Sequence, residues 1–170
     1  MEPILDKARE GQGVLERIMN AIPGFKGYRD KELRRDSDAI QREFLATRLE
    51  QCKGALNEIS AALTRSGSLD AMNDVETARK RLDKVVARIR FADRGYAPFF
   101  APVKVDESIL GRVYEFDMAL IGGVDQVRAA AQAAGAATTD VAAAVRALVA
   151  EIDALNTRMN ERETILSGIS

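Results

Sequence analysis

Apolar residues recur at every third or fourth position along four long stretches of this chain. Residues spaced in this way lie on one side of an α-helix, and that side must be buried against a partner. No comparable run alternates between apolar and polar residues, as a half-buried strand would. The pattern therefore predicts an all-α protein, with a core formed by Leu49, Leu56, Leu63, Leu82, Val85, Ile89, Leu120, Leu148, Ile152 and Leu155.

Breaks between these stretches predict an up-down bundle of four long helices, preceded by a shorter N-terminal helix. The short helix spans Glu2 to Ala21, and Pro23-Gly24 stops it. Short connections favour antiparallel neighbours, and 170 residues suit one domain covering 1–170. The four long helices are expected at 30–65, 69–94, 107–135 and 140–166.

Local residue choices predict how some of these helices begin and end. Gly67 suits the left-handed position after a helix, and Ser68 suits the N-cap of the next one. Thr139 or Asp140 is expected to cap the last helix. Gly122-Gly123, inside the helix before it, predicts either a kink or a close approach of a neighbouring helix.

Charge and cysteine content limit the classes of partner and compartment. With 25 basic and 26 acidic residues, the net charge of −1 argues against a dedicated nucleic-acid binder. Cys52, the single cysteine, lies on an apolar stripe and is interpreted as a small buried hydrophobic residue. The N-terminus does not resemble a signal peptide, and no stretch has the ~20 apolar residues of a membrane span. A cytoplasmic protein is expected.

Histidine is missing from the sequence, which removes the commonest general base and transition-metal ligand. No glycine-rich phosphate-binding motif is present either. Glu115 and Asp117 could in principle bind a hard cation, but two residues apart on a helix they point in different directions, so solvation or ion pairing is favoured. We therefore expect no cofactor, no bound metal and no enzymatic activity.

Two clusters of aromatic residues interrupt the regular helical pattern. Phe25 and Tyr28 bracket a turn, and the second cluster occupies a loop at 96–105. These side chains either cap one end of the bundle or form a patch that binds a protein partner. Antiparallel helices would return Arg94 to the level of Asp30, which would place the loop near the turn. The candidate partner-binding residues are Phe25, Tyr28, Tyr96, Phe99 and Phe100.

The segments IPGFKGYRDKELRRDSD (22–38) and RIRFADRGYAPFFAPVKVDESILGRVYEFD (88–117) resemble those of an uncharacterised family of bacterial helical proteins. The resemblance covers about the first three quarters of the chain. It implies a bacterial, cytoplasmic and helical protein. The family has no assigned activity, so the resemblance implies no catalytic residues.

Three functions remain open at this stage. The leading hypothesis is a non-catalytic interaction or scaffolding module, either alone or as a homodimer. The alanine-rich segment 129–150 then packs tightly or forms a flat self-association surface. The alternative is a peripheral membrane or envelope-associated protein that binds lipid through the helix at 2–21, although that helix is poorly basic. The third is an enzyme without histidine, built around Tyr28, Tyr96, Tyr114, Arg90 and Arg94.

Overall fold

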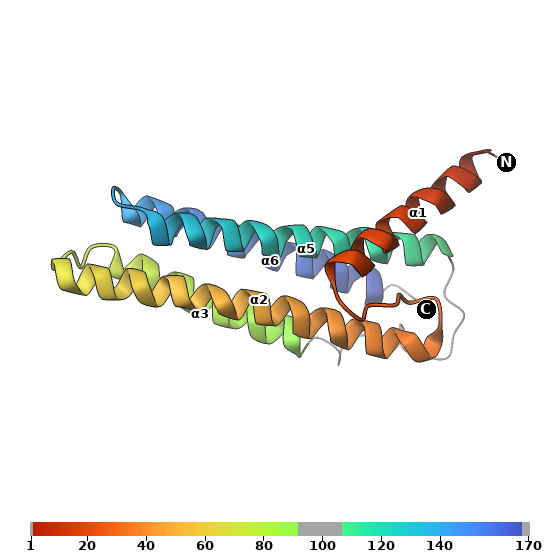
Figure 1. Ribbon diagram of the computed structural model, residues 1–170, viewed down its shortest axis with the longest axis horizontal. Coiled ribbons are helices and arrows are strands. Elements are labelled where there is room, and N and C mark those ends of the chain that lie inside the picture. Colours follow the sequence, from red (N-terminus) through yellow and green to blue (C-terminus); the bar gives the residue numbers. More distant parts are fainter. Residues whose placement is uncertain (1, 92–106, 168–170) are drawn as a thin grey trace.

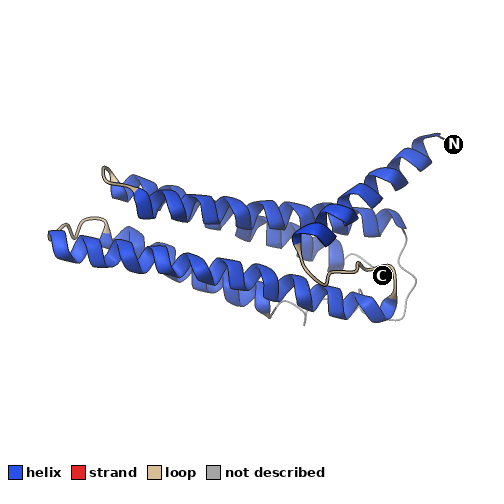
Figure 2. Cartoon of the chain, in the orientation of Figure 1, coloured by secondary structure: helices blue, strands red, loops and turns tan. Residues whose placement is uncertain are grey.

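A computed structural model describes residues 2–91 and 107–167 of the chain. These residues form helices joined by turns, and no strand occurs among them, which confirms the all-α prediction (Figure 2). None of the described helices is long and apolar enough to cross a membrane. The helices are α1 (Glu2–Ala21), α2 (Lys31–Ser66), α3 (Met72–Arg90), α5 (Glu107–Ala136) and α6 (Val141–Ser167).

The long helices lie side by side as two helical hairpins, one made of α2 and α3 and the other of α5 and α6 (Figure 1). Across the hairpins, α2 packs against α5 and α3 packs against α6. The first helix packs on α5, and its N-terminal half diverges from the other helices.

The core runs along the inside of the long helices, where the apolar stripes meet. All ten residues predicted for it are buried, each with at most 6% of its surface exposed. Cys52 is also buried, at 5% exposure, as expected for a small apolar side chain on a stripe.

The start of α3 differs from the prediction. The helix begins at Met72 rather than Leu69, and Leu69 is 64% exposed in the turn. Ser68 is not its N-cap, because Ala71 holds that position without a side-chain hydrogen bond. The main-chain N–H of Ser68 instead donates to Leu63 O, which closes the end of α2. Gly67 has φ +71°, as predicted for the residue after a helix.

The second hairpin agrees more closely with the sequence. Asp140 caps α6, because its carboxylate accepts a hydrogen bond from the main-chain N–H of Ala143 at 3.2 Å. The helix α5 continues through Gly122 and Gly123. A Cβ atom on Gly123 would lie 2.9 Å from Leu155 Cδ1, so this glycine marks a close approach of α5 and α6.

The two helices of the first hairpin are unequal in length, with 36 residues in α2 and 19 in α3. The carbonyl of Arg90, the last residue of α3, accepts a hydrogen bond from Arg42 at 2.7 Å. The helix α3 therefore ends at the level of Arg42. From the sequence we expected it to end at the level of Asp30, about three helical turns further along α2. The helix α2 extends beyond that level, and its buried residues there, among those whose side chains are described, are polar: Arg34, Ser37, Asp38 and Gln41.

Candidate functional site

A group of buried polar side chains occupies the interior beyond the end of α3. Its members come from four different segments, the turn 22–30, α2, α5 and α6, and none has more than 3% of its surface exposed. We call this group the polar cluster, and it consists of Tyr28, Asp38, Gln41, Asp117 and Arg162.

Arg162 is the centre of the polar cluster. Its Nε donates to Asp117 Oδ1 at 2.7 Å, and a terminal guanidinium nitrogen donates to Asp38 Oδ1 at 3.0 Å. One arginine from α6 thus joins a carboxylate on α5 to a carboxylate on α2. Isolated charges are very costly to bury, so each of these three groups depends on the others for its place in the interior.

The Tyr28 hydroxyl brings the turn into the polar cluster. Its oxygen lies 2.6 Å from Asp117 Oδ2 and 2.5 Å from Gln41 Oε1. A hydroxyl has one hydrogen, and the charged carboxylate is the stronger acceptor. Tyr28 therefore donates to Asp117, and a half-turn of the Gln41 amide would present an N–H to the tyrosine oxygen.

Burial raises the pKa of Tyr28 well above its usual range, and the negative charge of Asp117 raises it further. For Arg162, burial disfavours the charged form, but the nearby Asp117, Tyr28 and Asp38 outweigh burial, so the pKa of this guanidinium is raised well above its usual value. At neutral pH the tyrosine is therefore a neutral donor and the arginine a cation.

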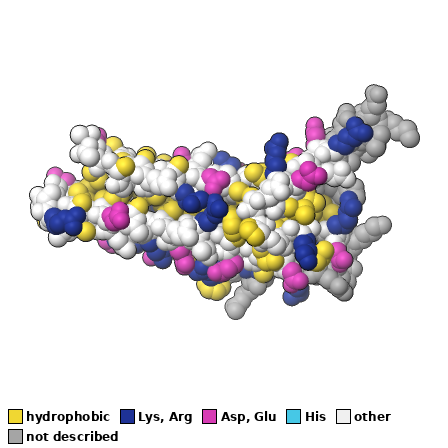
Figure 3. All heavy atoms as spheres, in the orientation of Figure 1, with side chains coloured by type: hydrophobic (Ala, Val, Ile, Leu, Met, Phe, Trp, Pro, Cys, Tyr) yellow, Lys and Arg dark blue, Asp and Glu magenta, His cyan; other side chains and the backbone are white. Residues whose placement is uncertain are grey.

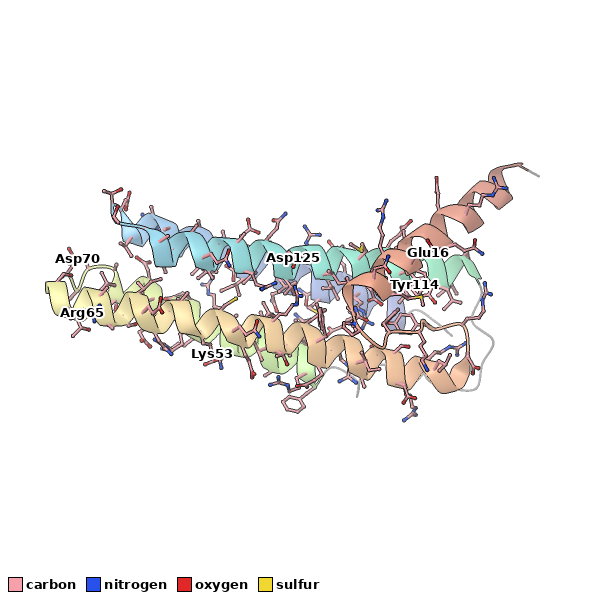
Figure 4. All side chains as sticks on the ribbon, viewed as in Figure 1. Glu16, Lys53, Arg65, Asp70, Tyr114 and Asp125 are labelled. Carbon is pink, nitrogen blue, oxygen red and sulfur yellow. The ribbon has the colours of Figure 1, made fainter. Side chains whose placement is uncertain are left out.

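The main chain of Tyr28 is held as firmly as its side chain. Its N–H donates to the Tyr114 hydroxyl at 2.8 Å, and its carbonyl accepts from Arg34 Nε at 2.7 Å. The rings of Tyr28 and Tyr114 stack, with centroids 5.5 Å apart and planes 9° apart. Phe25 contacts Tyr28 edge-on, with ring centroids 5.3 Å apart. In Figure 4, Tyr114 is labelled on α5 where α1 crosses that helix.

Gly27 is needed for this close contact between the turn and α5. Its φ of +98° is a left-handed conformation that favours glycine. A Cβ atom there would lie 2.8 Å from the Tyr114 hydroxyl oxygen and 3.2 Å from Leu15 Cδ1. A side chain at this position would therefore push Tyr114 away from the Tyr28 N–H.

Arg42 links the polar cluster to α3. Its Nε donates to Asp38 Oδ2 at 2.7 Å, while its other hydrogen bond goes to the carbonyl of Arg90. A positive charge at the C-terminus of a helix is also favourable for the helix dipole. Contacts within the chain therefore run continuously from the end of α3 to the turn 22–30.

Each carboxylate oxygen of the polar cluster accepts a hydrogen bond from a donor within the chain. The two oxygens of Asp38 accept from Arg162 and Arg42, and those of Asp117 accept from Arg162 and Tyr28. This arrangement fixes α2, α5 and α6 relative to one another and holds the turn 22–30 against them. Within the described residues, no group of three or more acidic or thiol side chains is placed to hold a metal ion.

The predicted partner-binding residues fall into two sets. Phe25 and Tyr28 are 2% and 0% exposed, so both side chains lie in the interior, and their contact with a partner stays a prediction. Tyr96, Phe99 and Phe100 lie outside the described residues, as does the proposed contact of their loop with the turn.

The residues proposed for a histidine-free enzyme are only partly together. Tyr28 and Tyr114 are in contact. The Arg90 side chain lies on the outside of α2 and α3, where it pairs with Glu50 at 2.7 Å and Glu43 at 3.2 Å. These two hydrogen bonds raise the pKa of Arg90, and the one to Glu50 lowers the pKa of Glu50. Arg94 and Tyr96 lie outside the described residues.

Ion pairing, one of the two outcomes expected for Asp117, is what the structure has, and it occurs in the interior. Glu115 is exposed and points away from it, as the helical spacing predicts. The sequence reasoning missed Asp38, Gln41 and Arg162 as partners. A signal was present, because each continues the apolar stripe of its helix at three- and four-residue steps. Asp38 and Gln41 precede Leu45 on α2, Asp117 lies between Val113 and Leu120, and Arg162 follows Met159.

A small surface pocket lies between α2 and α5, away from the polar cluster. Its lining residues are Gln51, Cys52, Ala55, Arg128, Ala131 and Gln132. Burial raises the pKa of the Cys52 thiol, and the opposing effect of Arg128 is smaller. The thiol is therefore less reactive than an exposed cysteine.

Comparison of the chain with protein-family models, with curated proteins and with solved structures found no match. The resemblance to a bacterial helical family is therefore untested by these comparisons.

Proposed function

We propose that this chain is a non-catalytic interaction or scaffolding module that presents helix faces to a protein partner or to a second copy of itself. Its proposed architecture is an up-down bundle of α2, α3, α5 and α6 with α1 as an added helix. The pairwise contacts of the four long helices support this arrangement, since each packs against two of the others. A cytoplasmic location and the lack of a cofactor belong to the same proposal.

The observation that carries the proposal is that donors within the chain bind the carboxylates of the polar cluster. All four carboxylate oxygens of Asp38 and Asp117 accept hydrogen bonds from Arg162, Arg42 or Tyr28. A catalytic acid or base needs a proton-transfer path to a substrate, whereas Asp38 and Asp117 are completely buried. The geometry of these buried groups is suited to holding α2, α5 and α6 in place. The outer faces of the helices are therefore the surfaces proposed to contact a partner.

The face shared by α2 and α5 is the best candidate for partner contact. Short ion pairs bridge two other sides, Lys53 with Asp83 between α2 and α3 and Arg88 with Glu163 between α3 and α6. Between α2 and α5 the ion pair of Arg48 with Asp125 is longer, at 3.6 Å. Figure 3 shows apolar side chains gathered in a band between α5 and α2. Partly buried apolar residues of these two helices that pack against the core are Ile40, Phe44, Ala55, Ile109, Met118 and Ala130.

A charge-matched pair of variants tests this face. Gln51 and Gln132 line the pocket between α2 and α5, and Gln51→Glu with Gln132→Glu adds two negative charges there. Lys80→Gln with Lys84→Gln changes the net charge equally on exposed positions of α3. The chain is immobilised and used to capture partners. Each captured partner is then purified, and its affinity for the wild-type chain and for both variants is measured. Self-association is followed by sedimentation velocity over a wide concentration range.

We expect the face variant to weaken binding by about tenfold or more, because charges are depleted at the centre of protein interfaces, and the α3 variant to bind normally. Equal binding by all three proteins would contradict the choice of face. A chain that stays monomeric and retains no reconstitutable partner would contradict the interaction module. Binding to lipid vesicles would favour the peripheral membrane alternative, although the exposed side of α1 carries both signs of charge, with Arg9 and Arg17 beside Glu10 and Glu16.

A further inference from the structure

We propose that α1 and the turn 22–30 form a releasable arm, and that the contacts of Tyr28 with the polar cluster are the latch that holds this arm closed. The arm would open by local release, while α2, α3, α5 and α6 remain folded. The inference does not depend on the identity of a partner.

The helical part of the arm is weakly attached. Of the described α1 side chains, which begin at Arg9, only Ile18 is buried. Val14, Leu15 and Ala21 are only partly buried where they pack against the core. The main helix contact of α1 is with α5. In Figure 1, α1 diverges from α5 toward the N-terminus. Few buried contacts are the mark of a segment that opens locally.

The turn, by contrast, is firmly attached. Ile22, Phe25 and Tyr28 are each at most 2% exposed. The Tyr28 hydroxyl, N–H and carbonyl contact Asp117, Tyr114 and Arg34 respectively. Attachment of the whole arm is thus concentrated at its C-terminal end, where Tyr28 reaches both α2 and α5.

The polar cluster can remain balanced when the arm leaves. Without Tyr28, Asp117 keeps its bond to Arg162 through Oδ1, and Asp38 keeps both Arg162 and Arg42. Asp117, Asp38 and Arg162 therefore each keep an ionic partner on release, and α2, α5 and α6 stay joined. Arg34 loses its hydrogen bond to the Tyr28 carbonyl. The freed Asp117 Oδ2 and the Tyr114 ring, against which Tyr28 stacks, would become accessible to water.

Hydrogen exchange of the full-length chain tests the latch through Tyr28→Phe. This variant removes the hydroxyl and leaves the ring, the stack on Tyr114 and the main-chain bonds. We expect amide exchange across residues 9–28 to increase by about tenfold, the effect of losing one hydrogen bond to a charged group. Exchange in 72–90 and 141–160 is expected to be unchanged.

A second variant and a control keep the test decisive. Tyr114→Phe removes the acceptor of the Tyr28 N–H and should act in the same direction. Arg81→Gln breaks the half-exposed ion pair with Asp153 between α3 and α6 and should leave the arm unchanged. Because the chain contains no tryptophan, Met19→Trp, at a half-exposed position of α1, gives a specific fluorescent probe. Its anisotropy should fall when Tyr28→Phe is added.

Faster exchange confined to the arm would support the latch. An equal increase across all helices would overturn it, because the turn would then unfold only with the whole protein. Unchanged exchange in both tyrosine variants would also overturn it, because the Tyr28 contacts would then not hold the arm.

Discussion

Arg162 donates to Asp117 across the contact between α6 and α5, at 2.7 Å and with no more than 3% of either residue exposed. The same guanidinium also binds Asp38 on α2. A buried ion pair of this kind contributes less to net stability than its Coulomb attraction suggests, since both charges have lost their water. It does penalise wrong arrangements strongly, because any slip of one helix leaves a charge buried without a partner.

Replacing Arg162 with Met should therefore destabilise the protein by about 3–5 kcal/mol, the usual cost of leaving buried carboxylates without their cation. The variant leaves Asp117 without an ionic partner and Asp38 with Arg42 alone. Chemical denaturation monitored by circular dichroism measures the free energy of unfolding.

Arg158→Met is the matched control on the same helix. Arg158 is only partly buried and makes a long hydrogen bond of 3.4 Å to the carbonyl of Ala119. It should cost about 1 kcal/mol or less. Similar losses for the two arginines would contradict the special role of the buried one.

The raised pKa of Tyr28 predicts how stability changes at alkaline pH. Burial and the charge of Asp117 hold the folded-state pKa of Tyr28 well above the usual tyrosine value of 10.0, so folding favours the protonated tyrosine. This contribution is fully present below pH 10 and is lost as the pH rises toward the folded-state pKa. Unfolding free energies measured from neutral pH to beyond pH 10 should therefore fall.

The Tyr28→Phe variant should show a shallower alkaline fall than the wild-type protein, because phenylalanine does not ionise. Some pH dependence should remain, since burial also raises the pKa of Tyr114. Identical alkaline profiles for the two proteins would show that Tyr28 is not held in its protonated form by the fold.

Truncation of the core stripes should be costly. Leu56 and Leu82 are completely buried on α2 and α3, and replacing either with Ala should cost about 2–5 kcal/mol through lost apolar contact and the cavity left behind. Glu58→Ala, at an exposed position of α2, should change the unfolding free energy by about 0.5 kcal/mol or less. Denaturant melts in which both leucine variants behave like Glu58→Ala would refute the proposed core.

The apolar periodicity was sufficient to predict the helices and the core, because burial of a stripe depends on spacing alone. Polar residues at stripe positions were harder to interpret. Asp38 and Arg162 each look like the exposed end of an amphipathic helix when one helix is considered at a time. Their pairing appears only when α2 and α6 are aligned in space, since 124 residues separate them in the chain.

Local end signals were less reliable than periodicity. Ser68 has the side chain of an N-cap, yet its main-chain N–H donates to Leu63 O at the end of α2. The helix α3 begins only at Met72. The prediction for Asp140 was correct, because its carboxylate accepts a hydrogen bond from an N–H in the first turn of α6. Capping by side chains is worth about 1 kcal/mol, which competing turn geometry can override.

The adjacent glycines of α5 provide the last prediction. A Cβ atom on Gly122 would meet nothing within 4 Å, whereas one on Gly123 would lie 2.9 Å from Leu155 Cδ1, a side chain that is fully buried. Alanine at either position improves helix propensity by about 1 kcal/mol. Gly122→Ala should therefore stabilise the protein by about this amount. Gly123→Ala must also displace Leu155, which costs about 1–3 kcal/mol, so it should be less stable than Gly122→Ala by that difference.

Thermal and denaturant unfolding of the two variants measures this difference in stability, with Gly54→Ala as a second unhindered site. If Gly123→Ala is as stable as Gly122→Ala, then α5 and α6 are not in the close contact that this glycine allows.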